Sequence, residues 1–193
     1  MKENPEKYRE LFKVFEILLV DGIIDTKFIN NWADTILSKE IQSEYEFVEI
    51  STTFNINELV TLLNKLSEKS ELIISQRAVF GILYNLNMYD SLEIRSVTRI
   101  VENFAYSEFL TEQEKNFLYR IDDFMDLAIT NVYGDYTKLK NEFWEFLKIY
   151  KNFNFENYHD WSNINNELDG KIPENIQNLA EKYSLKKKKW WKF

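Results

Sequence analysis

The stretch LIISQRAVFGILYNL, residues 72–86, decides the fold. In a helix formed by this stretch, apolar side chains would cover most sides around Gly81, whereas a helix at a protein surface carries a single apolar stripe. A helix with so wide an apolar surface must be enclosed by other elements. We therefore predict a central, buried helix here, with the rest of the fold packed around it.

Apolar side chains recur at helical spacing along most of the remaining chain, which predicts further helices. The stripes run over residues 8–19, 28–37, 59–66, 94–104, 117–128, 139–150 and 176–183. Thr111 and Glu114 have the spacing of a capping box, which marks the start of one of these helices. We predict an all-α fold, a single globular domain of about seven to nine helices over residues 1–185, followed by a basic-aromatic tail, residues 186–193. An asparagine-rich connection is expected over residues 152–170.

Residues 44–50 do not follow the helical pattern. Their sequence, EYEFVEI, nearly alternates between polar and apolar residues and is rich in residues that favour strands. It is predicted to be an extended connection or a short strand. A loop is the better prediction of the two, because a lone strand has no partner for its backbone hydrogen-bonding groups.

The composition argues against several classes of protein. Without cysteine, the chain has no disulfide, no thiolate metal site and no cysteine nucleophile. It has only 4 glycines and 2 prolines, and it lacks the glycine-rich phosphate-binding patterns of the common nucleotide-binding folds. Acidic residues follow too soon after the start for a signal peptide, and no apolar run is long enough to span a bilayer. We expect a soluble, cytoplasmic protein without a cofactor.

One acidic cluster has the spacing of a metal-binding motif. Asp122, Asp123 and Asp126 match the DDxxD pattern of class I isoprenoid synthases, in which helical carboxylates bind magnesium and a diphosphate. On a helix, Asp122 and Asp126 would share one face. The chain lacks the second motif that those enzymes place on a facing helix. A magnesium-dependent enzyme is therefore an alternative hypothesis, and a solvated helix face is the simpler interpretation.

The only histidine, His159, lies in a polar segment among aromatic residues. Glu156 and His159 have the spacing of half a di-iron site, but the second histidine that such a site requires does not exist in this chain. Glu142 and Glu145 are a further carboxylate pair and are most simply exposed charges. We therefore predict no catalytic residue and no metal site.

Charge is segregated along the chain. Residues 1–185 carry 32 acidic and 19 basic side chains, a net charge of −13, whereas the eight residues of the tail carry five lysines and no acid. A strongly acidic body favours a basic partner and repels nucleic acid and anionic membranes. The lysines and aromatics of the tail suit an anionic membrane surface, so a peripheral membrane-associated scaffold or regulator is a second alternative. A helix end, or a contact with the acidic body, is the simpler interpretation of the tail.

The acidic charge is concentrated between residues 40 and 64, where five acids occur without a lysine or arginine. Aromatic side chains are interleaved with these acids, so charge could steer a basic protein to the segment and the aromatics could anchor it. The predicted partner-binding residues are Glu40, Glu44, Tyr45, Glu46, Phe47, Glu49 and Phe54. The alternative is an exposed loop that its aromatic residues fix to the core.

Three motifs stand out towards the N-terminus. They are Asp21-Gly22-Ile23-Ile24, then Phe28-Ile29-Asn30-Asn31-Trp32-Ala33-Asp34, and Glu49-Ile50-Ser51 followed by Leu59 and Leu62. Together they resemble small helical bacterial proteins of the toxin-immunity type, which are encoded beside secreted toxins. The resemblance is confined to the N-terminal quarter of the chain. It implies a cytoplasmic, non-catalytic protein that binds one toxin domain and covers its active site, and a basic toxin would suit the acidic body.

Overall fold

The computed structural model describes residues 4–39, 44–87, 92–130, 132 and 134–183. Within these residues the chain forms ten α-helices, two short 3-10 helices and no strand, which confirms the all-α prediction. The α-helices are α1 (Arg9–Val20), α2 (Thr26–Lys39), α3 (Tyr45–Thr52), α4 (Ile56–Leu66), α5 (Leu72–Asn87), α6 (Ile94–Ala105), α7 (Glu112–Ile129), α8 (Tyr136–Lys148), α9 (Trp161–Asp169) and α10 (Ile172–Tyr183). The 3-10 helices are η1 (Pro5–Tyr8) and η2 (Phe155–Asp160).

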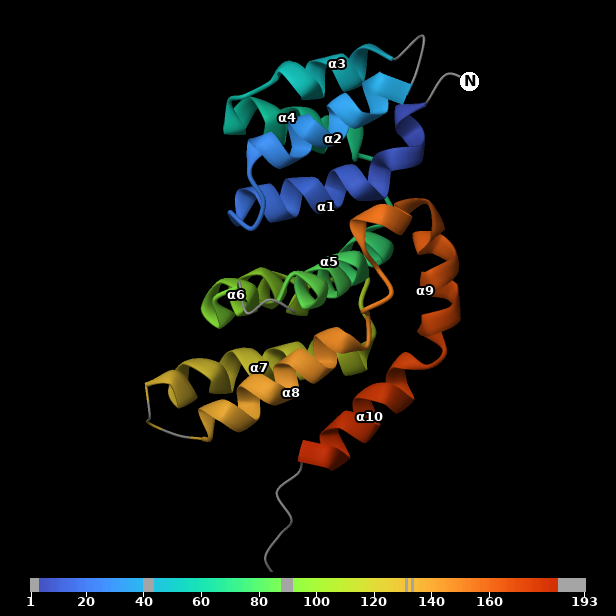
Figure 1. The fold of residues 1–193 in the computed structure, drawn as a ribbon. Coiled ribbons are helices and arrows are strands. Elements are labelled where there is room, and N and C mark those ends of the chain that lie inside the picture. Colours follow the sequence, from blue (N-terminus) through green and yellow to red (C-terminus); the bar gives the residue numbers. More distant parts are fainter. Residues whose placement is uncertain (1–3, 40–43, 88–91, 131, 133, 184–193) are drawn as a thin grey trace, which may run out of the picture.

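The helices are stacked in layers along the long axis of the molecule (Figure 1). α2, α3 and α4 form one end of the stack, and α1 lies between them and α5. α5 and α6 make the middle layer, and α7 and α8 make the next. α9 runs alongside the stack and contacts α5, while α10 packs on α7 and α8. The last two helices therefore brace layers that are formed by earlier parts of the chain.

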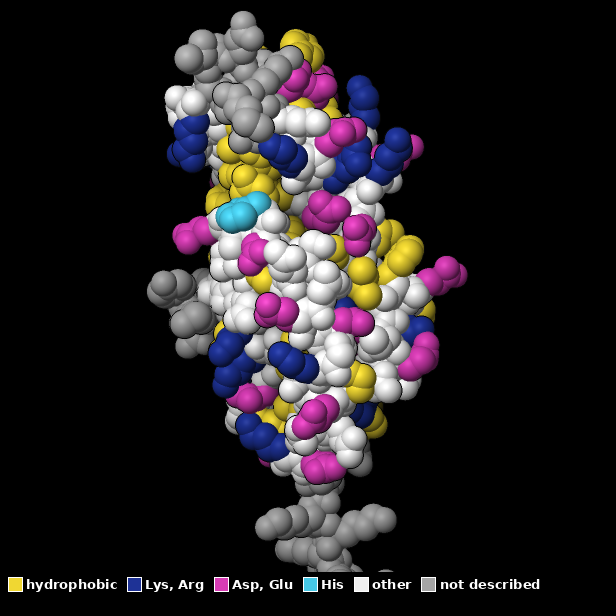
Figure 2. Space-filling view, turned by 90° about the vertical axis from the view of Figure 1, so that its right-hand side faces the viewer, with side chains coloured by type: hydrophobic (Ala, Val, Ile, Leu, Met, Phe, Trp, Pro, Cys, Tyr) yellow, Lys and Arg dark blue, Asp and Glu magenta, His cyan; other side chains and the backbone are white. Residues whose placement is uncertain are grey.

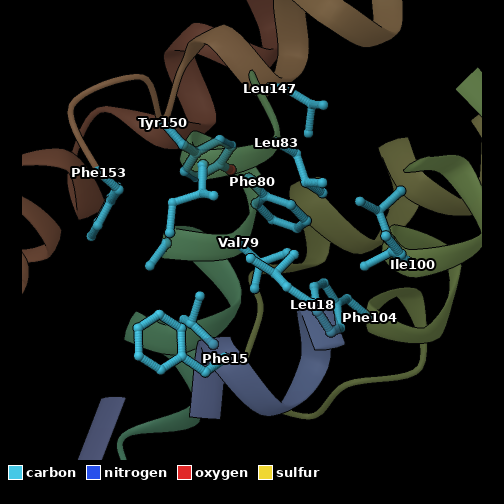
Figure 3. Packing of buried hydrophobic residues seen from close by; sticks show 14 of the residues in the cluster. Phe15, Leu18, Val79, Phe80, Leu83, Ile100, Phe104, Leu147, Tyr150 and Phe153 are labelled. Atoms are coloured by element: carbon cyan, nitrogen blue, oxygen red, sulfur yellow. The ribbon is translucent and has the colours of Figure 1, made fainter. Parts of the chain in front are cut away.

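α5 is the central helix that residues 72–86 predict. Its ten consecutive residues from Ile74 to Leu83 are all buried, so every side of the helix is covered. α1 covers one side of it, and α6, α8 and α9 cover the others. Figure 3 shows the apolar side chains that meet around α5, namely Phe15, Leu18, Val79, Phe80, Leu83, Ile100, Phe104, Leu147, Tyr150 and Phe153.

Gly81 allows α5 to approach the turn that follows α8. A Cβ atom at this position would lie 2.2 Å from the carbonyl oxygen of Tyr150 and 2.8 Å from Cβ of Phe153, too close for any side chain. One turn further along α5, Asn85 Nδ2 donates to the carbonyl oxygens of Lys151 and Phe153 at 3.1 and 2.9 Å. The absence of a side chain at Gly81 and the hydrogen bonds of the Asn85 amide thus hold this turn against α5.

A buried ion pair joins α5 to the start of α7. The side chains of Arg77 and Glu114 are fully buried, and Arg77 Nε and Nη2 donate to the two carboxylate oxygens at 3.0 and 3.1 Å. Nη1 donates to Asn165 and Asp169 of α9, each at 2.8 Å. Desolvation lowers the pKa of Arg77, but the hydrogen bond and charge of Glu114 oppose it, and the net pKa is raised. The guanidinium therefore stays charged and ties α5, α7 and α9 together.

Glu114 also closes the capping box that the sequence predicts. Its backbone N–H donates to Thr111 Oγ1 at 3.2 Å, and its carboxylate accepts from the Thr111 backbone N–H and hydroxyl, both at 2.8 Å. The Tyr150 hydroxyl donates to the same carboxylate at 2.7 Å. Burial and the Glu114 carboxylate raise the pKa of Tyr150 well above 10.0. With two bonds from Arg77, Glu114 accepts five hydrogen bonds, so its hydrogen-bonding capacity is met inside the protein.

Two helices form where the sequence predicts none, which raises the number of α-helices above the predicted seven to nine. α3 replaces the loop or strand predicted at residues 44–50. Phe47 and Ile50, three residues apart, are its buried residues, and Glu46 in its first turn favours a helix start. α9 forms inside the asparagine-rich connection and buries Trp161 and Asn165. Both helices are short and hold few buried residues, so neither produces a long apolar stripe.

Glu142 is buried, which contradicts the prediction that it is an exposed charge. Its carboxylate accepts from Arg120 Nη1 and Nη2 at 3.2 and 2.6 Å, so the pair joins α7 to α8. Glu145 is partly exposed and pairs with Lys148 and Lys182 at 3.3 and 3.2 Å. Desolvation raises the pKa of Glu145, but its hydrogen bonds to the two lysines bring it below its usual value.

Candidate partner-binding surface

α3 buries one face and exposes the other. Phe47 and Ile50 are fully buried. The ring of Phe47 meets those of Tyr8 and Trp32 at centroid distances of 5.4 and 6.1 Å, which anchors α3 to the core. On the opposite face Tyr45 is 72% exposed. The helical spacing therefore divides the interleaved aromatics of this segment between the core and the surface.

Asn30 of α2 holds the C-terminal end of α3 in place. Its Nδ2 donates to the carbonyl oxygens of Ile50, Ser51 and Thr53 at 2.6, 3.1 and 3.0 Å. These groups lie where a helix leaves its last carbonyls without partners. The Ser51 hydroxyl also donates to the carboxylate of Asp34, again from α2. The sequence gives no sign of this role for Asn30, because its acceptors lie 20 to 23 residues further along the chain.

The connection from α3 to α4 presents a second aromatic side chain. Phe54 is 74% exposed and precedes Asn55, whose side-chain oxygen accepts from two backbone N–H groups at the start of α4, at 2.9 and 3.2 Å. Phe54 is thus held between the clamped end of α3 and a capped helix start. Val48 and Ile56 are also exposed, by 42% and 47%. Four hydrophobic side chains therefore face solvent on α3, this connection and the first residue of α4.

Acidic side chains line two grooves beside α4. Glu44 and Glu46 line a groove of about 500 Å³ next to η1. Glu49 and Glu58 line a second groove, of about 380 Å³, together with Leu62. The basic residues that line these grooves are Arg9, Lys65 and Lys69 in the first and Lys65 in the second. With Glu6 and Glu68 in the first groove, acids outnumber basic residues in both.

The seven predicted partner-binding residues fall into three groups. Glu40 lies outside the described residues. Phe47 is a core residue, because its side chain is fully buried. The other five lie on α3 or at its ends and are partly or fully exposed, together with two hydrophobic residues that the sequence did not single out. We refer to this set as the α3 surface: Glu44, Tyr45, Glu46, Val48, Glu49, Phe54 and Ile56.

Two carboxylates of the α3 surface have no partner among the described residues. The carboxylates of Glu46 and Glu49 form no hydrogen bond or ion pair with any residue in the described ranges. Lys65, which lines both grooves, forms no ion pair within those ranges either. The charges of these two carboxylates are therefore available to a partner.

The DDxxD cluster lies on α7. Asp122 is partly buried, whereas Asp123 and Asp126 are exposed. Desolvation raises the pKa of Asp122, and the negative charges of Asp123 and Asp126 raise it further. Within the part of the chain that the structure describes, no group of three or more acidic or histidine side chains has the geometry to hold a metal ion. The arrangement thus brings like charges together on α7.

His159 is exposed in η2, and its ring meets that of Tyr158 at a centroid distance of 5.5 Å. Nearby, Trp161 Nε1 donates to the carbonyl oxygen of Asn154 at 3.1 Å, which anchors the segment. Figure 2 shows the side of the molecule on which α9 lies, with the histidine in cyan. Acidic and basic side chains are interspersed on this side, so it offers no continuous patch of one charge.

Residues 186–193, which carry the membrane-contact hypothesis, lie outside the described residues. Among the residues that are described, no helix is long and apolar enough to cross a membrane.

No protein-family model, curated protein or solved structure matches this chain. The resemblance to toxin-immunity proteins therefore stays a prediction.

Proposed function

We propose that this protein is a non-catalytic binding protein that takes up a basic partner protein on its α3 surface. The observation that carries the proposal is the exposure of Tyr45 and Phe54, 72% and 74%, on the same surface as the carboxylates of Glu46 and Glu49, which form no ion pair with any described residue. Aromatic side chains are enriched among the residues that contribute most to protein–protein binding. Acidic side chains around them speed the approach of a basic protein.

The anchoring of α3 supports this proposal. Asn30 fixes the end of the helix, and Phe47 fixes its inner face, so the exposed aromatics are presented on an ordered backbone. A surface that is ordered before binding loses less conformational entropy when the partner docks. We expect a partner to bind with little rearrangement of α3.

The partner class follows from charge together with the resemblance at the N-terminus. An acidic inhibitor that covers the active site of a basic toxin domain has the charge and the non-catalytic character that we propose here. Under this proposal the protein is an immunity-type inhibitor, and the α3 surface is the part that contacts the toxin.

Site-specific photo-crosslinking in the cells that naturally contain the chain tests the proposal. A photoreactive phenylalanine analogue at position 54 should crosslink to one basic protein. The same analogue at Val132, which is 71% exposed at the connection between α7 and α8, is the matched control and should not capture that protein. Equal crosslinking from both positions, or an acidic crosslinked protein, would contradict the proposal.

The captured protein is then purified and its affinity measured. Phe54→Ala should weaken binding by about 2 kcal/mol if Phe54 is a central anchor. Because Phe54 is largely exposed, the free energy of unfolding should stay within about 0.5 kcal/mol of the unsubstituted value. Unchanged affinity in this variant would remove Phe54 from the interface.

A further inference from the structure

A second group of aromatic side chains is exposed where α6 and α7 meet. Tyr106, the C-cap residue that follows α6, is 69% exposed, and Tyr119 of α7 is 38% exposed. Their ring centroids are 5.2 Å apart at an interplanar angle of 87°. Phe109, in the connection between the two helices, is 50% exposed. Three aromatic side chains therefore lie uncovered at one corner of the molecule.

Carboxylates continue the same edge. α6 and α7 are antiparallel neighbours. The step from Tyr106 back to Glu102 on α6 and the step from Tyr119 forward to Asp122 on α7 therefore run in the same direction. Each step is one helical turn, which keeps the residues on one face. Desolvation raises the pKa of Glu102, and the negative charges of Asp122 and Asp126 raise it further, in agreement with the placement of like charges along this edge by the helical spacing. We refer to Glu102, Tyr106, Tyr119 and Asp122 as the α6–α7 edge.

Four cations lie on these two helices: Arg95 and Arg99 on α6, and Lys115 and Arg120 on α7. Arg95 and Arg99 are exposed, and the charge of Arg99 acts on Asp21, where it opposes the rise in pKa caused by desolvation. Lys115 pairs with Glu112, and Arg120 pairs with Glu142 while its guanidinium carbon lies 5.0 Å from the ring centroid of Phe117. Within the described ranges, neither acid of the α6–α7 edge forms an ion pair. Both carboxylates are therefore open to an ion pair with a partner.

We propose that the α6–α7 edge is a docking site for an arginine- or lysine-bearing segment of a partner protein. A cation there would contact the exposed tyrosine rings and at the same time reduce the repulsion among the carboxylates. The charge of the edge selects this occupant over an apolar or acidic one, which would gain from the rings but not from the acids. The site is separate from the α3 surface, because α3 and the α6–α7 pair lie in different layers of the stack (Figure 1).

A nuclear magnetic resonance titration of the ¹⁵N-labelled full chain tests this proposal. The probe is the peptide acetyl-Ala-Arg-Ala-Arg-Ala-amide, and its control is the same peptide with citrulline, a neutral isostere, in place of each arginine. We expect saturable shifts of the backbone amides of Glu102, Tyr106, Tyr119 and Asp122 with the arginine peptide. Binding of the citrulline peptide at this edge should be at least about fivefold weaker, since it lacks the ion pairs and the cation–π contact.

Two variants of the edge and one control complete the test. Tyr106→Ala should weaken the arginine peptide by about two- to fivefold, the value of a cation–π contact at an exposed site. The double substitution Glu102→Gln and Asp122→Asn should weaken it by about fivefold or more, without loss of thermal stability, because it removes like-charge repulsion. Tyr45→Ala, on the α3 surface, should leave the affinity of the edge unchanged.

The outcomes separate the two proposals. Absence of saturable shifts at the edge, an equal response to both peptides, or unchanged affinity in both edge variants would overturn the docking site. Shifts confined to residues 44–56 would overturn it while leaving the proposed function of the α3 surface in place. Shifts at the edge in a protein whose position 54 captures no partner would support the docking site and count against the proposed function.

Discussion

Glu114 and the acids of the α3 surface carry the same charge in opposite surroundings. Glu114 is fully buried and accepts five hydrogen bonds from Arg77, Thr111 and Tyr150. The carboxylates of Glu46 and Glu49, in contrast, have no partner among the described residues, and both residues line grooves at the surface. The buried acid organises the fold, and the surface acids leave their charge available for binding.

The difference shows where substitutions should affect stability and where they should affect association. A buried charge that loses its partner keeps the whole cost of its desolvation. An exposed charge is already hydrated, so neutralising it changes the stability of the fold little but changes the field around the molecule. The following predictions test this contrast, from the largest expected effect on stability to the smallest.

Arg77→Met should have the largest effect. It leaves the carboxylate of Glu114 buried without its cation, and breaking a buried pair in this way costs about 3–5 kcal/mol. Urea denaturation followed by circular dichroism measures the free energy of unfolding. Arg9→Met, which removes an exposed pair with Glu6, is the control and should cost about 1 kcal/mol or less. If both variants lose the same stability, burial does not decide the role of the acid in this protein.

Gly81→Ala should lower the free energy of unfolding by about 1–3 kcal/mol, because the new methyl group overlaps the carbonyl oxygen of Tyr150. This change tests whether the turn that carries Tyr150 must sit tightly against α5 for Glu114 to be satisfied. Gly170→Ala is the matched control, since nothing lies within 4 Å of its Cβ position. The control should be neutral or slightly stabilising. A neutral Gly81→Ala would mean that the turn shifts freely.

Asn30→Ala tests the anchoring of the α3 surface rather than its charges. It removes three hydrogen bonds to buried and partly buried carbonyl oxygens at the end of α3, which should cost about 1–3 kcal/mol. Hydrogen exchange of the α3 amides should speed up more than exchange elsewhere. Asn31→Ala, one residue further along and exposed, is the control and should change neither quantity. Equal protection of α3 in both variants would show that Phe47 alone holds the helix.

The sequence predicts the parts of this contrast that depend on local patterns. Apolar residues on most sides of a helix over residues 72–86 identify α5, and the spacing of Thr111 and Glu114 identifies the cap of α7. Both signals arise within a few turns of one helix. Arg77 gives no such signal, because its partner lies 37 residues away and a charge in an apolar helix could equally face solvent.

α3 shows why local patterns fail at the candidate site. Tyr45 and Val48 are exposed, and with the buried Phe47 and Ile50 they produce a near-alternation of apolar and acidic residues that resembles a strand. Which aromatic of the segment faces the core depends on the phase of the helix, and the contacts with Tyr8 and Trp32 set that phase. These contacts come from other parts of the chain. The segment could therefore be identified from sequence, but Phe47 could not be told apart from Tyr45.

The alkaline limb of the stability curve should report on Tyr150. Burial and the Glu114 carboxylate raise its pKa well above 10.0 in the folded state, so above pH 10 the unfolded chain loses this proton and the folded chain keeps it. The stability contribution is present below pH 10 and falls as the pH rises above it, by up to about 1.4 kcal/mol per pH unit. Between pH 10 and 11 the free energy of unfolding should therefore fall by about 1 kcal/mol more in the unsubstituted protein than in Tyr150→Phe. Parallel curves for the two proteins would show that the hydroxyl ionises as easily in the folded state.

Glu46→Gln combined with Glu49→Gln should have the smallest effect on stability and the clearest effect on association. Glutamine is preferable to lysine here because Glu46 lies in the first turn of α3, where a positive charge would oppose the helix dipole. The free energy of unfolding should change by less than about 0.5 kcal/mol. The association rate constant with the basic partner, measured by stopped-flow at low salt, should fall severalfold, and the difference should shrink as ionic strength rises. Glu167→Gln combined with Glu174→Gln, on α9 and α10, removes the same charge from exposed positions away from α3 and is the control. Equal slowing by the two double variants would mean that only the net charge of the protein steers the partner. The position of Glu46 and Glu49 on the α3 surface would then not affect the association rate.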